Sequence, residues 1–127
     1  MHMIHRLFKN VVLLRILLVM ILGTGACGTT AFAQESEHDK ITYMLNVIGS
    51  SRLTFIRNGN EYDGKEAKEH LQEKIDLLGN RIHTAEDFIL YIGSKSLVTG
   101  APYSVRLVDG TEIKADIWLR DQLAGMK

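Results

Sequence analysis

The sequence predicts an α+β fold: a single small domain of about four helices packed on a small antiparallel sheet of hairpins. Two signals alternate along residues 36–126 and support this class. Apolar residues at three- and four-residue spacing mark helices, and short β-branched or aromatic runs around Asn58-Gly59 and Asp109-Gly110 mark hairpins. The resulting order is helix, hairpin, helix, helix, hairpin, helix, which is typical of an α+β domain.

The first helix is expected over residues 36–50, because Ser36 can cap it and apolar residues recur along one face. That face holds Ile41, Met44, Leu45 and Ile48. Residues 53–57 are rich in β-branched and aromatic side chains, as strands are, and Asn58-Gly59 is a strong signal for a two-residue turn. Residues 61–62 then form a short return strand.

The second helix is expected over residues 65–78, with Asp63 as its cap and Glu66 completing a capping box. Its apolar stripe is Ala67, Leu71, Ile75 and Leu78. Gly79-Asn80 should end this helix, because both residues tolerate a positive φ. Thr84 starts a third helix, with Asp87 three positions later. The core-facing side chains of this third helix are Phe88, Ile89 and Ile92.

A polar loop over residues 94–101 leads to Pro102 and a strand over 103–108. After the Asp109-Gly110 turn, residues 111–114 return antiparallel. Asp116 then opens a last helix. The side chains of this helix that are expected to pack inward are Trp118, Leu119, Leu123 and Met126.

The N-terminal segment has the features of a secretory signal peptide. Arg6 and Lys9 precede an apolar run, and Ala31-Phe32-Ala33 ends the segment in the small-residue pattern of a cleavage site. The uninterrupted apolar part, residues 16–22, is shorter than the roughly 20 residues that a membrane span needs, although an uncleaved anchor is the alternative.

We therefore expect residues 1–33 to be a signal peptide cleaved after Ala33, and residues 34–127 to be a single domain without a transmembrane segment. The protein is then periplasmic or secreted. Cys27, the only cysteine, follows Ala26 as in bacterial lipoprotein sites, but Thr24 stands where such sites usually have leucine. Lipid attachment through Cys27 is thus the less favoured alternative, and cleavage after Ala33 leaves a chain without disulfides.

The charge of the expected mature chain differs from that of the whole sequence. Three of the 15 basic residues (Arg6, Lys9 and Arg15) lie in the signal, which leaves 12 basic against 15 acidic residues, a net charge of about −3. Basic residues form no block in this part of the sequence. Both facts argue against nucleic acid as a partner, since nucleic-acid binding depends on clustered lysine and arginine.

Several separate motifs follow one another along the chain. They are Phe55-Ile56-Arg57-Asn58-Gly59, Glu66-Ala67, His70-Leu71 with Lys74, Thr84-Ala85-Glu86-Asp87-Phe88-Ile89, Ser94-Lys95-Ser96, Gly100, Pro102-Tyr103 and Val105. In this order they resemble the YfeK-like family of small secreted bacterial proteins, whose domain is of unknown function. The resemblance covers residues 40–123 and implies a location and a shape, but no activity, ligand or catalytic residue.

His70 is the first candidate for chemistry. It lies four residues after Glu66 and four before Lys74, and this spacing places the three side chains on one helical face. A carboxylate beside a histidine can tune it as a general base, whereas the simpler interpretation is a solvated charged stripe. A metal site would need His70 to meet His83 and a carboxylate, but no metal-binding motif is present, so we expect no metal and no cofactor.

The loop that contains Ser94, Lys95 and Ser96 is the second candidate. A serine beside a lysine can serve as nucleophile and base, although loop hydroxyls more often cap backbone groups. The same loop, with Arg57 and Arg106 from the sheet, could bind a carboxylate or phosphate, because the planar guanidinium suits such groups. Arg57 is expected on the outer face of its strand.

The sequence thus favours an exported, non-enzymatic bacterial envelope domain that binds a partner protein or an anionic envelope component. The alternatives are a small hydrolase, with His70 as base and Ser94 or Ser96 as nucleophile, and a metal-binding periplasmic protein. The residues expected to form the binding surface are Arg57, Asn58, His70, Lys74, Ser94, Ser96 and Tyr103.

Overall fold

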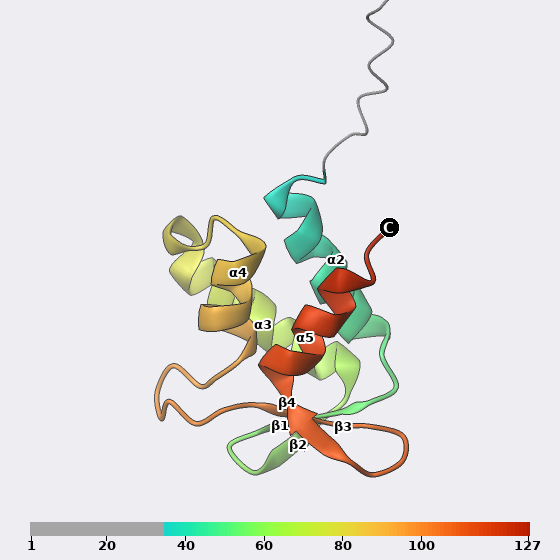
Figure 1. The fold of residues 1–127 in the computed structure, drawn as a ribbon. Coiled ribbons are helices and arrows are strands. Elements are labelled where there is room, and N and C mark those ends of the chain that lie inside the picture. Colours follow the sequence, from blue (N-terminus) through green and yellow to red (C-terminus); the bar gives the residue numbers. More distant parts are fainter. Residues whose placement is uncertain (1–34) are drawn as a thin grey trace, which may run out of the picture. The chain divides into compact units, whose positions relative to one another are not determined.

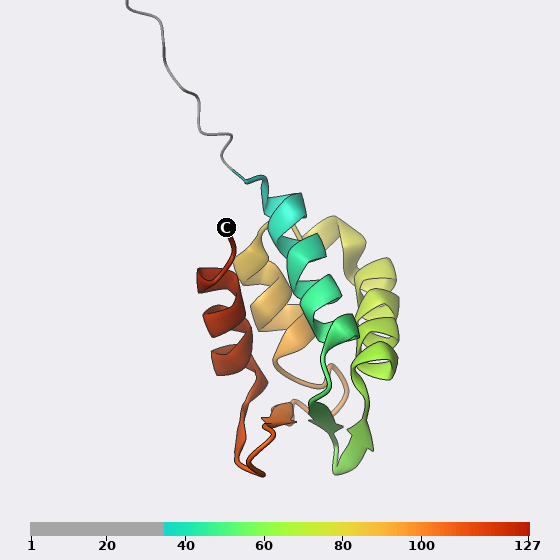
Figure 2. The same cartoon turned by 90° about the vertical axis from the view of Figure 1, so that its right-hand side faces the viewer.

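Helices cover one face of a four-stranded antiparallel sheet (Figures 1 and 2). This architecture comes from a computed structural model, which describes residues 35–127. The expected signal peptide and Cys27 lie outside the described residues. The α+β class with about four helices is confirmed. Among residues 35–127, no helix combines the length and hydropathy needed to cross a membrane.

The sheet joins the two expected hairpins side by side. Its strands are β1 (Thr54–Arg57), β2 (Asn60–Tyr62), β3 (Ser104–Arg106) and β4 (Glu112–Lys114), in the order β2-β1-β3-β4. One row across the sheet, formed by Tyr62, Phe55, Val105 and Ile113, is paired residue by residue. Since successive strand residues point to opposite faces, the members of this row share the face that packs on the helices.

The two hairpin turns differ in conformation. Asn58 and Gly59 have φ values of 50° and 77°, the left-handed pair that a two-residue turn with Asn-Gly requires. In the second hairpin only Gly110 has a positive φ, of 89°, and the Gly110 amide donates to the Leu107 carbonyl. That turn is therefore a wider loop closed by a glycine, and β3 ends at Arg106, two residues before the expected strand end.

Helix α2 (Glu37–Ser50) and helix α3 (Gly64–Leu78) begin at capping boxes. The Ser36 hydroxyl accepts from the Asp39 amide, and the Asp63 carboxylate accepts from the Glu66 amide, as expected for α3. Helix α3 ends at Leu78, as expected, but the expected left-handed residue at its end is wrong. Gly79 has a φ of −46°, and the chain continues into the 3₁₀ helix η1 (Gly79–Arg81) instead of turning through a left-handed residue.

The third helix is not a regular α-helix. It begins as α4 (Ala85–Asp87), with the expected capping box between Thr84 and Asp87, and then widens into the π-helix η2 (Phe88–Gly93). Its expected inward side chains, Phe88, Ile89 and Ile92, are buried. The sequence could not reveal the wider turn, because apolar spacing over six residues is compatible with both pitches.

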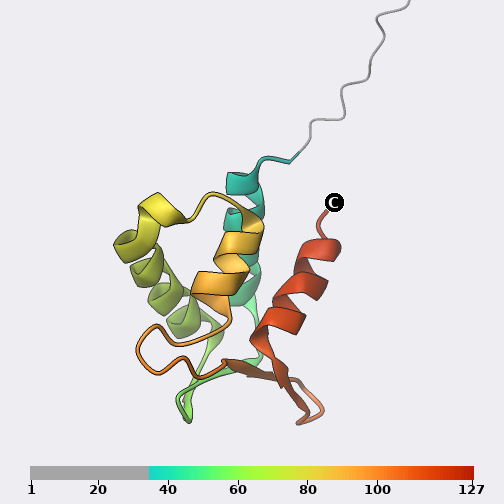
Figure 3. The ribbon, with the colours of Figure 1, turned by 60° about the vertical axis from the view of Figure 1, so that its left-hand side comes forward.

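Helix α5 (Ala115–Ala124) starts directly after β4, one residue before the expected Asp116. It lies in front of the other helices in Figure 1. Trp118 and Leu119 are buried and Leu123 is partly buried against the core, but Met126 is not part of it. The Phe55 and Trp118 rings meet edge to face, with centroids 5.5 Å apart, so Trp118 is a core residue. The loop over residues 94–101 projects between η2 and β3 (Figure 3).

Candidate functional site

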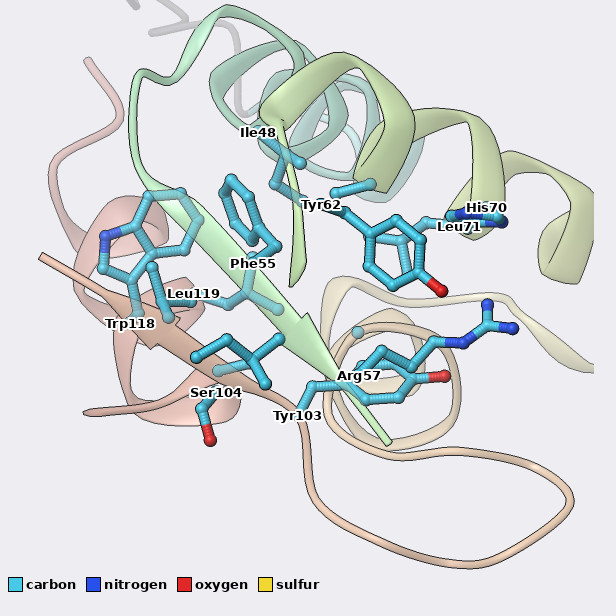
Figure 4. A pocket seen from close by; sticks show the side chains of 15 residues that line it. Ile48, Phe55, Arg57, Tyr62, His70, Leu71, Tyr103, Ser104, Trp118 and Leu119 are labelled. Atoms are coloured by element: carbon cyan, nitrogen blue, oxygen red, sulfur yellow. The ribbon is translucent and has the colours of Figure 1, made fainter. Parts of the chain in front are cut away.

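A small cavity lies between the inner face of the sheet and the helices (Figure 4). Its volume is about 40 Å³. Its apolar wall comes from α2, α3, α5 and two strands, through Ile48, Leu71, Trp118, Leu119, Phe55 and Val105. Four further lining residues with polar side chains gather at one end of the cavity (Figure 4). We call them the polar rim, and they are Arg57, Tyr62, His70 and Tyr103.

Arg57 faces the helices, and the expectation that it lies on the outer face of the strand is wrong. Arg57 and Phe55 are two residues apart in β1, so both point to the inner face. The Arg57 guanidinium carbon lies 6.0 Å from the centroid of the Tyr62 ring, which in turn meets the His70 ring edge to face at 4.8 Å. Within residues 35–127, no hydrogen bond or ion pair engages the Arg57 guanidinium.

Lys74 lies behind the rim, and the residue is only 7% exposed. Its ammonium donates to the carbonyl of Ile92 at 2.6 Å, to the carbonyl of Lys95 at 2.8 Å and to the Tyr103 hydroxyl at 3.2 Å. The ammonium also lies 4.8 Å from the centroid of the Tyr103 ring. Lys74 therefore ties α3 to the end of η2 and fixes the position of Tyr103.

The expected charged stripe of Glu66, His70 and Lys74 does not form. Four residues advance a helix by about 40° beyond a full turn, so Lys74 is rotated by about 80° from Glu66, toward the core. The Glu66 carboxylate instead accepts from the Asp63 amide at the start of α3. His70 therefore has Tyr62 as its neighbour and not a carboxylate partner from its own helix.

Positive charge gathers at this end of the cavity. Burial, together with the nearby charges of Arg57 and Lys95, lowers the pKa of Lys74 from 10.5 to about 8. Burial raises the pKa of the Tyr103 hydroxyl, an effect that Arg57 opposes. No carboxylate contributes to either shift, so the cationic groups are not neutralised by acidic neighbours among the described residues.

Three other expected site residues stabilise loops. The Asn58 side-chain oxygen accepts from the Thr99 hydroxyl at 3.0 Å, and the Ser94 hydroxyl donates to the Leu90 carbonyl at 2.8 Å. Ser96 is buried, and its hydroxyl accepts from two backbone amides of its own loop. In the part of the chain that the structure describes, neither serine is hydrogen-bonded to His70. The structure thus brings together four of the expected site residues, Arg57, His70, Lys74 and Tyr103. Asn58, Ser94 and Ser96 instead make contacts that stabilise loops.

Arg106 does not join the rim. It alternates with Val105 and so points to the outer face of the sheet, where its guanidinium pairs with Glu61 at 2.6 Å and with Glu112 at 2.9 Å. The expectation that Arg106 and Arg57 act together is therefore wrong.

Between residues 35 and 127, no three histidine, cysteine or carboxylate side chains gather as a possible metal site.

Tyr62 is the rim residue that the sequence reasoning missed. The tight Asn58-Gly59 turn fixes the register of the hairpin, and that register places Tyr62 directly opposite Phe55. Phe55 packs inward against Trp118 in the structure, and its cross-strand partner therefore faces inward too. The turn thus indicated that Tyr62 shares a face with Phe55 and Arg57, but the expected outward direction of Arg57 would have placed all three outside.

The fold and the rim define a small α+β domain with an apolar cavity beneath a cationic and aromatic rim. Residues 35–127 match the family of unknown function DUF5329, and the chain belongs to this family. It is 42% identical over 76 residues to the uncharacterized protein YfeK of Salmonella typhimurium strain LT2. The match covers 58% of this chain and 63% of that protein, and it confirms the YfeK-like resemblance. No solved structure matches the chain.

Proposed function

We propose that this protein is a small exported domain of the bacterial envelope that binds an anionic group at the polar rim and catalyses no reaction. The observation that carries the proposal is Arg57, a half-buried residue at the cavity whose guanidinium has no carboxylate partner among the described residues. A partly desolvated guanidinium is stabilised by an anion, and its planar fork matches a carboxylate or phosphate.

The neighbours of Arg57 support an anion at this place. Lys74 and Lys95 add positive charge, and the Tyr62 and Tyr103 hydroxyls can donate hydrogen bonds. The acidic residues closest in sequence are engaged elsewhere, since Glu61 pairs with Arg106, and Asp63 and Glu66 form the capping box of α3. The positive potential at the rim is thus available to a ligand from solution.

Substituting Arg57→Gln should abolish anion-dependent stabilisation of the protein. The melting temperature would be followed with acetate, sulfate and phosphate at constant ionic strength. An anion present at 100 times its dissociation constant should add about 2.7 kcal/mol to the free energy of unfolding. The matched control is Arg106→Gln, on the opposite face of the sheet, which should keep the anion response. No response in the unmodified protein, or an equal response in Arg57→Gln, would contradict the proposal.

Export is proposed from the basic start, apolar centre and Ala31-Phe32-Ala33 pattern of the N-terminal segment. The intact mass of the protein recovered from a bacterial envelope fraction should correspond to a chain that begins at Gln34. A chain that begins at a lipid-modified Cys27 would establish an anchored form instead. A chain that keeps residues 1–33 would contradict cleavage.

A further inference from the structure

The cavity behind the polar rim limits the size of any apolar group that a ligand could insert. Its volume is about 40 Å³. For comparison, cavities that hold benzene measure about 150 Å³. The space therefore matches one or two carbon-sized groups, and it is too small for an aromatic ring or a long acyl chain.

The walls of the cavity favour carbon over water. Val105 is fully buried, and Leu71, Trp118 and Leu119 are nearly so, and each presents only hydrocarbon or aromatic surface to the space. A buried water would need two to four polar partners there. Ser104 also belongs to the lining. The polar ends of Arg57, Tyr62 and Tyr103 gather at the rim (Figure 4). The site thus has one charged end and one apolar end.

Lys74 supports this site without contacting a ligand. All three of its ammonium hydrogens are engaged, two by backbone carbonyls and one by the Tyr103 hydroxyl. Its charge adds to the potential at the rim, and its bond to Tyr103 holds that ring in place. Direct contact with an anion therefore falls to Arg57, with the rim hydroxyls as additional donors.

Resting on the proposed anion site, we infer that the ligand is a carboxylate whose α-carbon carries a one- or two-carbon apolar substituent. The carboxylate pairs with Arg57, and the substituent enters the cavity between Phe55 and Leu71. Inorganic phosphate and sulfate could pair with the guanidinium but would leave the apolar space empty. A free short-chain acid and the C-terminal alanine of a peptide both have the required chemistry.

The test is a titration of the isotope-labelled protein, followed by amide chemical shifts, with acetate, propionate, butyrate and hexanoate at constant ionic strength. Each methylene buried in the cavity should tighten binding about fourfold. Affinity should rise from acetate to butyrate and fall at hexanoate, whose chain exceeds the space. Arg57→Gln should remove the binding of all four acids.

A cavity-filling variant gives a second readout. Val105→Ile adds one methylene to the cavity wall and should weaken butyrate binding more than acetate binding. The matched control is Val108→Ile at the tip of the second hairpin, where Val108 is 93% exposed and distant from the cavity lining. The chain-length series on the unmodified protein keeps the inference testable if Val105→Ile disturbs the fold.

The possible results separate this inference from the proposed function. Two results would overturn the cavity inference and keep the anion site. One is equal affinity for all four acids, with binding lost in Arg57→Gln, and the other is binding of sulfate but of none of the acids. Equal binding of propionate and neutral 1-propanol, or no binding of any anion, would overturn both. If the inference holds, comparing propionate with N-acetyl-alanyl-alanine identifies the source, since a peptide ligand should bind more tightly than the free acid.

Discussion

Substituting Lys74→Met should lower the free energy of unfolding by about 3 kcal/mol, measured by urea denaturation. Methionine preserves most of the buried volume but donates no hydrogen bonds, so the carbonyls of Ile92 and Lys95 lose their charged donor. A buried polar group without a partner costs about 1–3 kcal/mol, and removal of the buried charge offsets part of that cost.

The control for this substitution is Lys68→Met on the same helix. The Lys68 ammonium also makes a side-chain hydrogen bond, to the Asn46 side-chain oxygen at 3.0 Å, but that bond is exposed to solvent. Exposed contacts of this kind change stability by roughly 0.5 kcal/mol or less. Equal losses in the two variants would show that the buried position of Lys74 has no special energetic role.

Lys74 should also produce a characteristic pH dependence. The pKa of Lys74 is about 8 in the folded protein, and its ordinary value of 10.5 applies to the unfolded chain. Between pH 8 and 10.5 the unfolded chain therefore binds more protons than the folded protein. The free energy of unfolding must then rise with pH above 8, and this stabilisation is lost again as the pH falls through 8. The raised pKa of Tyr103 works in the opposite direction above pH 10, so the rise is expected between pH 8 and 10.

The fold tolerates deprotonation of Lys74 because the neutral amine can keep hydrogen bonds to all three of its partners. Its two remaining hydrogens can donate to the carbonyls of Ile92 and Lys95, while its lone pair accepts from the Tyr103 hydroxyl. Lys74→Met should lack the rise in stability between pH 8 and 10. A rise of the same size in that variant would assign the pH dependence to another group.

Gly64→Ala should destabilise the protein by about 3 kcal/mol, the upper end of the usual cost of overpacking. Gly64 is the first residue of α3 and lies against the end of α2. An added methyl group would overlap the backbone carbonyl oxygen of Ile48 and lie 2.7 Å from that of Ser51. Backbone atoms cannot move aside separately, so the two helices would have to shift apart.

Gly49→Ala is the matched control, and its melting temperature should be unchanged or higher. The three atoms nearest to the added methyl group would all belong to the Lys68 side chain, with Cδ closest at 2.7 Å, and this flexible chain can move away. Alanine is also favoured over glycine inside a helix by up to about 1 kcal/mol. If both variants lost the same stability, the close approach of α2 and α3 at Gly64 would not be the cause.

The sequence by itself determined the local features of this protein. The Asp63 and Thr84 caps of α3 and α4, the Asn58-Gly59 turn and the apolar face of α2 all lie where they were expected. Each depends on residues within about four positions of one another, so short-range geometry decides it. The α+β class followed from the order of these local signals.

Only the tertiary structure decided where the charged side chains lie. Lys74 finds its partners 18, 21 and 29 residues further along the chain, and no local pattern encodes those contacts. Arg57 and Arg106 look equivalent as strand arginines, yet the register of β1 and β3 sends them to opposite faces of the sheet. Burial and charge pairing depend on which segments meet in space, and for this reason the cationic rim emerged only from the folded chain.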